Sequence, residues 1–123
     1  MPILNLLGTP EGVDGLRVLA TKLQQSVEAF PDFELTRQQV SVFYPVDRMQ
    51  EGLGEELILM IDGFFSKPAR TPQLRDAWSA TLCGILQEFA TEHVPHCTKI
   101  EVILRVFDPN FNGFAQWEKV KAE

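Results

Sequence analysis

The sequence predicts an α+β protein, an α/β two-layer sandwich of tandem βαβ units in which two helices cover one face of a four-stranded mixed sheet. Strand-like and helix-like runs alternate as β-α-β and then β-α-β, and each helix-like run carries one apolar stripe. Both helix-like runs open on a Thr-Pro pair, at Thr9-Pro10 and Thr71-Pro72, about half the chain apart. This loose repeat leaves a duplicated βαβ unit and coincidence equally open.

The first βαβ unit begins with a short apolar strand at Ile3 to Leu7. A helix is expected to start at Thr9-Pro10-Glu11, because threonine caps helices, proline suits the first helical position and an acid favours the first turn. Apolar residues at helical spacing run from Val13 to Phe30, and Pro31 ends the helix. Gln39 to Val46 then alternates in the manner of a strand.

The second unit starts after a glycine-containing turn at Met49 to Glu55. Leu57 to Phe65 is a strongly apolar strand, and the helix opened by Thr71 continues with apolar residues from Leu74 to Phe89. Pro95 breaks that helix.

The last part of the chain predicts two strands of unequal length. Thr98 to Phe107 is the longest alternating run, and Asp108-Pro109-Asn110 forms a turn after it. Phe111 to Trp117 is expected to form a short extra strand.

The face of the sheet away from the helices is expected to be mixed in character. It would carry Ser41, Phe43, Ile58, Met60, Asp62, Phe64, Glu101, Ile103 and Arg105. A monomer would leave this half-apolar face in water, and such a surface usually marks an interface. Oligomerisation through the open sheet face is therefore expected.

The composition is that of an acidic globular protein. The 123 residues suffice for a single domain, 1–123, and 45% are hydrophobic. The net charge of −6 argues against nucleic acid and anionic membranes as partners, but it permits a local cationic pocket for a small anion. No apolar run reaches the roughly 18 residues that span a bilayer, and no signal peptide is visible. Two cysteines without framework spacing, Cys83 and Cys97, favour the reducing cytoplasm.

Metal and cofactor sites are not expected. His93, His96 and Cys97 have a spacing like that of ligands, but no fourth partner lies nearby in the sequence. The sequence has no glycine-rich phosphate loop and no Ser-His-Asp order that indicates a triad.

Pro2 is the strongest candidate for chemistry. The initiator methionine is usually removed before a small residue such as proline, and the new N-terminus would then be a secondary amine on the first strand. That amine can act as a base without any side chain. If Met1 is retained, Pro2 is a tertiary amide and inert.

The chain resembles the tautomerase superfamily in four features taken together. These are a Pro2 on a strand, a doubled βαβ unit, the chain length and an open sheet face. Its larger members include macrophage migration inhibitory factor and carboxymethyl-hydroxymuconate isomerase. The whole chain fits that plan. Three segments are similar to parts of the migration inhibitory factor group. The second helix is represented by Thr81 to Ile85, the last strand by Val102 to Phe107, and the C-terminal turn by Asp108, Asn110 and Gly113. The chain looks most like a bacterial branch.

The resemblance implies a homotrimer in which three sheets form a barrel, helices lie outside and sites lie at subunit interfaces. It also implies keto–enol proton transfer on a small α-keto or 2-hydroxy-alkenoic acid, with the Pro2 amine as general base and no cofactor. Burial or a nearby cation would lower the pKa of that amine toward neutrality, where a base is efficient.

Arg105 is the best candidate to bind the substrate carboxylate, with Ile103 beside it on the open face. A structural ion pair between Arg105 and Asp62 or Glu101 is the alternative, and Asp62 is expected to pair rather than to orient a water. Phe43 and Phe64 could form apolar walls of the pocket or belong to the core or interface.

The sequence has no second arginine at a position that matches the family pattern, although Arg48 and Arg70 lie in loops near strand ends. Two further interpretations remain. One is a catalytically silent binding or structural trimer of the same fold, and the other is a ferredoxin-like ligand-binding domain, whose second strand would not lie beside the first.

Overall fold

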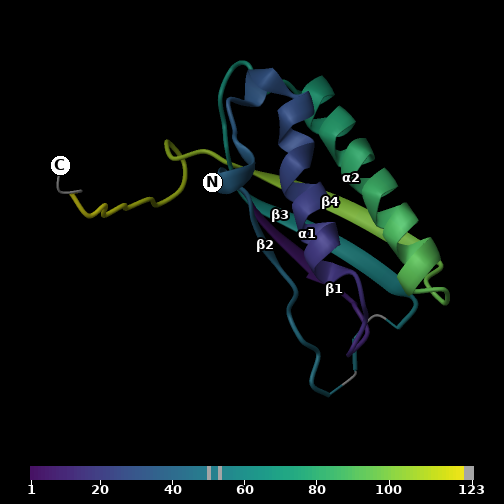
Figure 1. Ribbon diagram of the computed structural model, residues 1–123. Helices are drawn as coiled ribbons and strands as arrows, with labels where there is room; N and C mark the ends of the chain where they lie inside the picture. Colours follow the sequence, from purple (N-terminus) through teal and green to yellow (C-terminus); the bar gives the residue numbers. More distant parts are fainter. Residues whose placement is uncertain (50, 53, 121–123) are drawn as a thin grey trace.

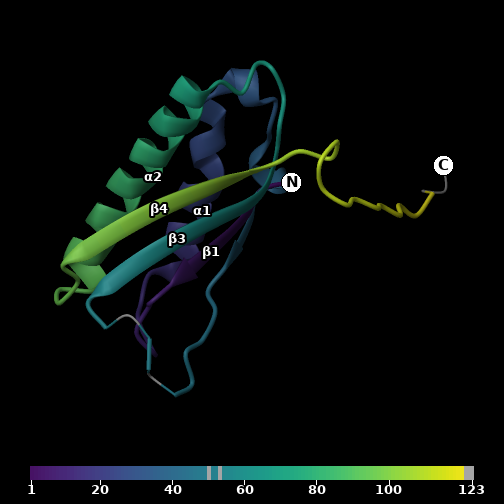
Figure 2. The same cartoon turned by 180° about the vertical axis from the view of Figure 1, so that it is seen from behind.

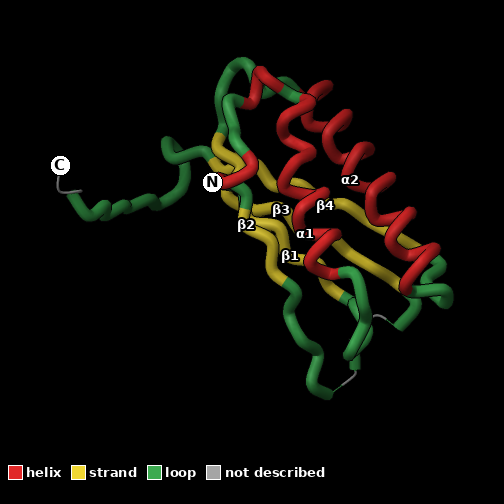
Figure 3. The backbone as a smooth tube through the Cα atoms, in the orientation of Figure 1, coloured by secondary structure: helices red, strands yellow, loops and turns green. Residues whose placement is uncertain are grey.

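Four strands form one mixed sheet in the order β2-β1-β3-β4, and both helices lie over one of its faces (Figures 1 and 3). The structure is a computed structural model that describes residues 1–120 except Gln50 and Leu53, so these two positions of the predicted 49–55 turn lie outside the described residues. The elements are β1 (Ile3–Leu7), α1 (Leu16–Gln25), β2 (Ser41–Phe43), β3 (Glu56–Phe65), α2 (Pro72–His93) and β4 (Lys99–Phe107), with short 3-10 helices at Ser26–Ala29, Pro31–Phe33 and Arg37–Gln39.

The pairing of the strands decides between the two folds left open by the sequence. β1 pairs with β2 in parallel and with β3 antiparallel, and β3 pairs with β4 in parallel. The second strand therefore lies beside the first, and the ferredoxin-like interpretation is wrong. The predicted α+β class, with tandem βαβ units and both helices on one face, is confirmed.

The first helix begins at Leu16, later than the Thr9-Pro10 signal predicts. Gly15, immediately before it, is left-handed with φ of 84°, and a β-carbon there would lie 2.6 Å from Nε2 of His93. A right-handed helix cannot extend back through such a residue. At its other end the helix tightens into the 3-10 turn Ser26–Ala29.

The second helix follows the sequence pattern. Thr71 caps it, because its hydroxyl oxygen accepts a hydrogen bond from the Leu74 amide at 3.2 Å, and Pro72 is the first helical residue. The helix ends at His93, two residues before Pro95, as that proline requires.

Two strand predictions are wrong in extent. The second strand covers only Ser41–Phe43 rather than 39–46, because Arg37–Gln39 forms a 3-10 turn before it. The extra strand expected at Phe111 to Trp117 is absent from the described residues, and that segment extends away from the sheet instead (Figure 2).

The core lies between the helices and one face of the sheet. Its fully buried large side chains include Leu4 and Leu6 of β1, Leu59 and Ile61 of β3, and Trp78 of α2. The Trp78 indole N–H donates a 2.8 Å hydrogen bond to the Ser26 hydroxyl, so the one polar group of this large side chain is satisfied inside the core.

A β-bulge at Gly63 changes which way the end of β3 faces. The register with β4 shifts between Ile61 and Phe64, and Gly63 adopts a left-handed φ of 70°. Phe64 consequently points toward the helices, where it is 0% exposed and packs against Phe33 and Trp78. The placement of Phe64 on the open face was wrong, because simple alternation does not include the extra residue.

Candidate functional site

The candidate site lies where β1 begins. The Pro2 side chain is buried and its carbonyl accepts a hydrogen bond from the Ser41 amide at 3.1 Å, so this residue is held at the head of the first two strands. Met1 is 66% exposed. The nitrogen of Pro2 therefore lies at the boundary between the core and solvent.

The bulge at Gly63 gives the backbone of the N-terminus room to lie against β3. A β-carbon on Gly63 would lie 2.6 Å from the carbonyl oxygen of Met1, whose carbonyl carbon is bonded to the Pro2 nitrogen. Only glycine permits so close an approach at this φ. The same bulge that turns Phe64 inward thus makes space next to Pro2.

The surroundings of the N-terminus disfavour a positively charged amine. Burial lowers the pKa of the Met1 amine below its ordinary value of 8.0, and the positive charges of Arg70 and Lys67 lower it further. Both cations lie in the loop that follows β3. Because β3 runs antiparallel to β1, that loop returns to the end of the sheet where Pro2 lies.

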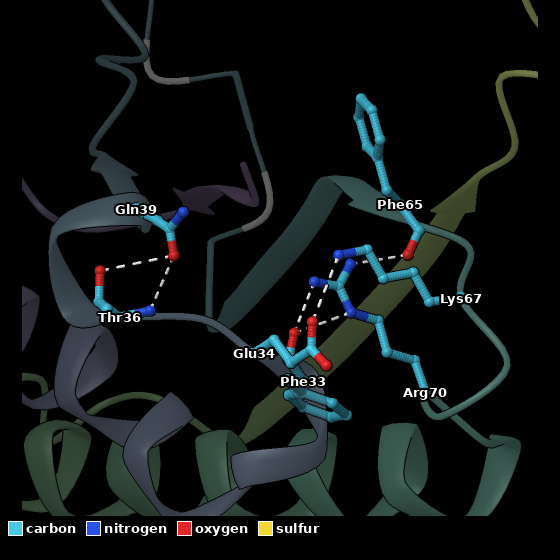
Figure 4. Close-up of polar contacts among 7 residues, drawn as sticks. All are labelled: Phe33, Glu34, Thr36, Gln39, Phe65, Lys67 and Arg70. Atoms are coloured by element: carbon cyan, nitrogen blue, oxygen red, sulfur yellow. Dashed lines mark hydrogen bonds and ion pairs between the residues drawn. The ribbon is translucent and has the colours of Figure 1, made fainter.

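Arg70 is held rigidly by backbone carbonyls (Figure 4). It is 7% exposed, its Nε and Nη2 donate to the Phe33 carbonyl at 3.1 and 2.6 Å, and its Nη1 donates to the Phe65 carbonyl at 2.7 Å. The guanidinium also lies 4.8 Å from the centre of the Phe64 ring. Its positive charge is therefore fixed in place beside the N-terminus.

Lys67 is the more exposed of the two cations. Its ammonium lies 3.9 Å from a carboxylate oxygen of Glu34, and both side chains are largely exposed (Figure 4). An exposed pair at this distance contributes little to stability.

Arg105 and Asp62 form an ion pair on the open face of the sheet. Arg105 Nε lies 2.8 Å from Oδ1 of Asp62, and its Nη2 donates to Oδ2 at 2.9 Å. This two-point contact is the structural alternative foreseen for Arg105. Asp62 is the register partner of Ile3, so the pair lies close to Pro2 along the sheet.

The other predicted site residues are spread over the chain. Phe43 and Ile103 are 53% and 39% exposed, but they lie on opposite edge strands, about 14 Å apart at the usual strand spacing. Phe64 lies beneath Arg70 on the helix side. Arg48 follows the end of β2 that is farther from Pro2, because β1 and β2 run in parallel.

The sequence analysis named Arg70 only as a possible second arginine and did not single out Lys67, and the structure places both near the N-terminus. The signal that could have found them is topological. Because β3 pairs antiparallel with β1, the loop that follows β3 lies near the start of β1. That loop contains both Lys67 and Arg70.

The remaining ligand-like residues do not gather into a site. Among the described residues, no group of three histidine, cysteine or acidic side chains is placed to hold a metal. The His93 ring packs 5.1 Å from that of Phe89, and the Cys97 thiol lies 3.5 Å from the Lys99 carbonyl.

In the described part of the chain, no helix is long and apolar enough to cross a membrane.

Comparison with known proteins gives structural neighbours but no sequence relatives. No protein-family model and no curated protein matches the chain. The F6 fused 4-OT asymmetric trimer matches with a TM-score of 0.64 and 16% identity, over 91% of both chains. A migration inhibitory factor-like protein of Entamoeba histolytica matches at 0.57 and 10%, over 93% of this chain and 95% of its own. A 5-carboxymethyl-2-hydroxymuconate isomerase of Deinococcus radiodurans R1 matches at 0.57 and 14%, over 98% and 90%.

These neighbours all belong to the tautomerase superfamily. At such low identity the likeness establishes the fold, and this chain has the tautomerase-superfamily fold, as the resemblance in its sequence predicted.

Proposed function

We propose that this chain is a tautomerase-like isomerase that uses the amine of Pro2, freed by removal of Met1, to transfer a proton on a small α-keto or 2-hydroxy-alkenoic acid. The observation that carries the proposal is the environment of the N-terminus. Pro2 is buried and directly precedes the first strand of a tautomerase fold. Burial and the charges of Arg70 and Lys67 lower the pKa of the neighbouring Met1 amine. An unprotonated amine near neutral pH is what a general base requires.

The proton transfer needs only the chain and its substrate. The neutral Pro2 amine accepts the hydroxyl proton of the enol, and the resulting ammonium returns a proton to the substrate carbon to form the keto acid. The fixed charge of Arg70 stabilises the negative charge that develops on the substrate oxygen, and it disfavours prolonged protonation of Pro2.

Lys67 is proposed to bind the substrate carboxylate, and Arg105 is the second candidate for this role. Lys67 is exposed and loosely paired, so an incoming carboxylate replaces Glu34 at little cost. Arg105 would first have to release Asp62, which holds it at two points. Ile103, Phe43 and Asp62 would reach the site from the open face of this or a neighbouring copy.

The proposed assembly is a homotrimer with the open sheet faces inward. The exposed Ile3, Phe43 and Ile103 on that face support a covered surface, and one structural neighbour is described as a trimer. Placing the open faces together would also bring Phe43 of one copy toward the site of another. The cytoplasm is the proposed location, supported by two free cysteines, Cys83 and Cys97.

The direct test replaces the base. In a chain that begins at Pro2, Pro2→Ala is expected to slow conversion of an enol such as enolised phenylpyruvate by about 100-fold or more, because a primary amine is a poorer match in position and basicity. Asn5→Ala, on the same strand, is the matched control and should retain the rate. An unchanged rate in Pro2→Ala would remove the proposed role of Pro2.

The second candidate is a silent trimer of the same fold that binds small anions. A Met1 that is retained in the natively expressed chain would favour it, because Pro2 is then an amide. Intact-mass measurement of the natively expressed chain separates the two functions, since a chain that keeps Met1 cannot use Pro2 as a base.

A further inference from the structure

Gly63 lies opposite Pro2 at one end of the sheet. Ile3 pairs with Asp62 in the antiparallel register of β1 and β3, so one step further along each strand brings Pro2 level with Gly63. In both opposite views the N-terminus lies where β3 and β4 end (Figures 1 and 2). The first atoms of the chain therefore lie against the backbone of β3 at its bulge.

The backbone of Met1 fills the space between Pro2 and Gly63. A β-carbon on Gly63 would lie 2.6 Å from the Met1 carbonyl oxygen and 3.6 Å from the carbonyl carbon, and 3.9 Å from Cδ1 of Ile3. The first distance is shorter than real β-carbons show, and a backbone oxygen cannot swing aside as the end of a long side chain can. We refer to the space held by the Met1 carbonyl group as the Met1 space. It is open only because residue 63 has no side chain.

Removal of Met1 would give this space to a molecule that approaches the Pro2 nitrogen. In the processed chain the nitrogen carries one hydrogen and one lone pair, and both point into the sector where the Met1 carbonyl carbon was bonded. An atom that exchanges a proton with this nitrogen has to lie about 2.6–3.2 Å from it. The reacting atoms of a substrate therefore enter the Met1 space.

The charges around the Met1 amine indicate where a carboxylate would lie. Burial lowers the pKa of this amine, and the positive charges of Arg70 and Lys67 lower it further. Cations that disfavour a positive charge at this position favour a negative charge there. A carboxylate in the place of the Met1 amine would therefore be stabilised by both side chains.

The backbone of Met1 has the same atom spacing as an α-keto acid. In Met1 the path runs from the amine nitrogen through Cα and the carbonyl carbon to the carbonyl oxygen. In an α-keto acid a path of equal length runs from a carboxylate oxygen through two carbons to the keto oxygen. An α-keto acid can thus place its carboxylate near Arg70 and Lys67 and its keto or enol oxygen beside Gly63.

From these observations we infer that Met1 fills the place of the substrate, and that Gly63 is a specificity-determining residue that keeps this place open to the carbon–oxygen unit of an α-keto acid or its enol. This step rests on the proposed function for the nature of the substrate. Removal of Met1 then has two effects, because it frees the Pro2 amine and clears the space that the substrate needs. A side chain at position 63 would close that space even in the processed chain.

Gly54 provides a matched control for the backbone conformation of Gly63. The two glycines have similar left-handed φ angles, 75° at Gly54 and 70° at Gly63. A β-carbon on Gly54 would meet nothing within 4 Å. Gly54→Ala therefore introduces the same backbone strain as Gly63→Ala without entering the Met1 space.

The first experiment tests whether Met1 and a side chain at position 63 compete for one space. Thermal unfolding is measured for chains that begin at Met1 or at Pro2, each with glycine or alanine at position 63. Gly63→Ala is expected to lower Tm by at least about 4 °C more in the chain that begins at Met1, because only that chain places a carbonyl oxygen against the new methyl group. Gly54→Ala should lower Tm equally in both chains. Equal effects of Gly63→Ala in the two chains would overturn the inference.

The second experiment measures binding without turnover. The probe is α-fluorocinnamate, a planar analogue of the enol of phenylpyruvate with fluorine in place of the hydroxyl group, and fluorine NMR gives its Kd. In chains that begin at Pro2, Gly63→Ala is expected to raise Kd at least about tenfold, whereas Gly54→Ala should leave it unchanged. The chain that keeps Met1 should also bind at least about tenfold more weakly. An unchanged Kd in Gly63→Ala, or no binding by the unaltered chain that begins at Pro2, would refute the inference.

A third measurement separates closure of the space from displacement of Pro2. In the chain that begins at Pro2, Gly63→Ala is expected to change the pKa of the Pro2 amine less than Lys67→Met does, as followed by NMR titration. An equal or larger change would show that alanine acts by moving the N-terminus, which contradicts the inference.

None of these measurements uses conversion of an enol. A chain that shows all three expected results but no conversion would refute the proposed role of Pro2 as a base and leave the inference standing. Normal conversion by Gly63→Ala, with an unchanged Kd, would refute the inference alone.

Discussion

Arg70 connects three parts of the chain at the end of the sheet that holds Pro2. Its guanidinium bonds to the carbonyls of Phe33 and Phe65 and covers the Phe64 ring. In the sequence it appears only as a charged loop residue. Its burial depends on the 3-10 turn at Pro31–Phe33 packing next to the end of β3, and local periodicity carries no information about that long-range contact.

Arg70→Met is expected to destabilise the fold by about 2–3 kcal/mol, because two buried carbonyls lose their charged donor and methionine cannot replace it. Urea unfolding measures this loss. Lys67→Met, in the same loop but exposed, should change the free energy of unfolding by less than about 0.5 kcal/mol. Similar small losses in both variants would show that the Arg70 bonds contribute little.

The N-terminal amine gives a direct readout of the local charges. In a chain that retains Met1, Lys67→Met is expected to raise the amine pKa toward its ordinary value of 8.0, because one of the cations that lowers it is removed. Lys22→Met removes a charge from α1 instead and should leave the pKa where it was. NMR titration of the amine distinguishes the two, and equal shifts would contradict the proposed local effect.

The same lowered pKa fixes the sign of a pH effect on stability. Between the lowered folded pKa and the ordinary 8.0, the unfolded amine binds more protons than the folded one. This group therefore makes stability rise with pH across that window, and its contribution is lost as pH falls through it.

At the scale of elements, helices and strands could be predicted where the local sequence signals agree with one another. The prediction failed where the backbone conformation of a single glycine overrides those signals. Thr71-Pro72 marks the start of α2 correctly, but the equivalent signal at Thr9-Pro10 fails because Gly15 is left-handed against His93. Alternation places β3 correctly up to Asp62. Beyond it, Gly63 inserts a bulge, and the predicted face of Phe64 is inverted.

Gly63→Ala, in a chain that keeps Met1, is expected to cost about 2–4 kcal/mol. A β-carbon there would lie 2.6 Å from the Met1 carbonyl in addition to the strain of a left-handed φ. Gly54→Ala is the matched control, since Gly54 has a similar φ of 75° with no neighbour within 4 Å, and it should cost only about 1 kcal/mol. Thermal unfolding compares them. Equal costs would mean that the close approach at Gly63 is unimportant.

At the scale of the whole molecule, the order of strands explains both what could be predicted and what could not. The βαβ pattern and the mixed open face are visible in the sequence, and the fold they predicted is the one observed. The position of Arg70 and Lys67 near the N-terminus depends on the antiparallel pairing of β3 with β1. Only the three-dimensional structure reveals that pairing. Arg105, the cation expected from strand alternation, is paired with Asp62, which is one of the two alternatives that the sequence left open.

The central claim is that the Pro2 amine, freed by removal of Met1, performs the chemistry. Its most direct test compares enol-to-keto conversion at neutral pH by two chains that differ only in whether they begin at Met1 or at Pro2. The chain that begins at Pro2 is predicted to be at least about 100-fold faster, because only it presents a free secondary amine beside Arg70 and Lys67. Equal rates for the two chains would contradict the account.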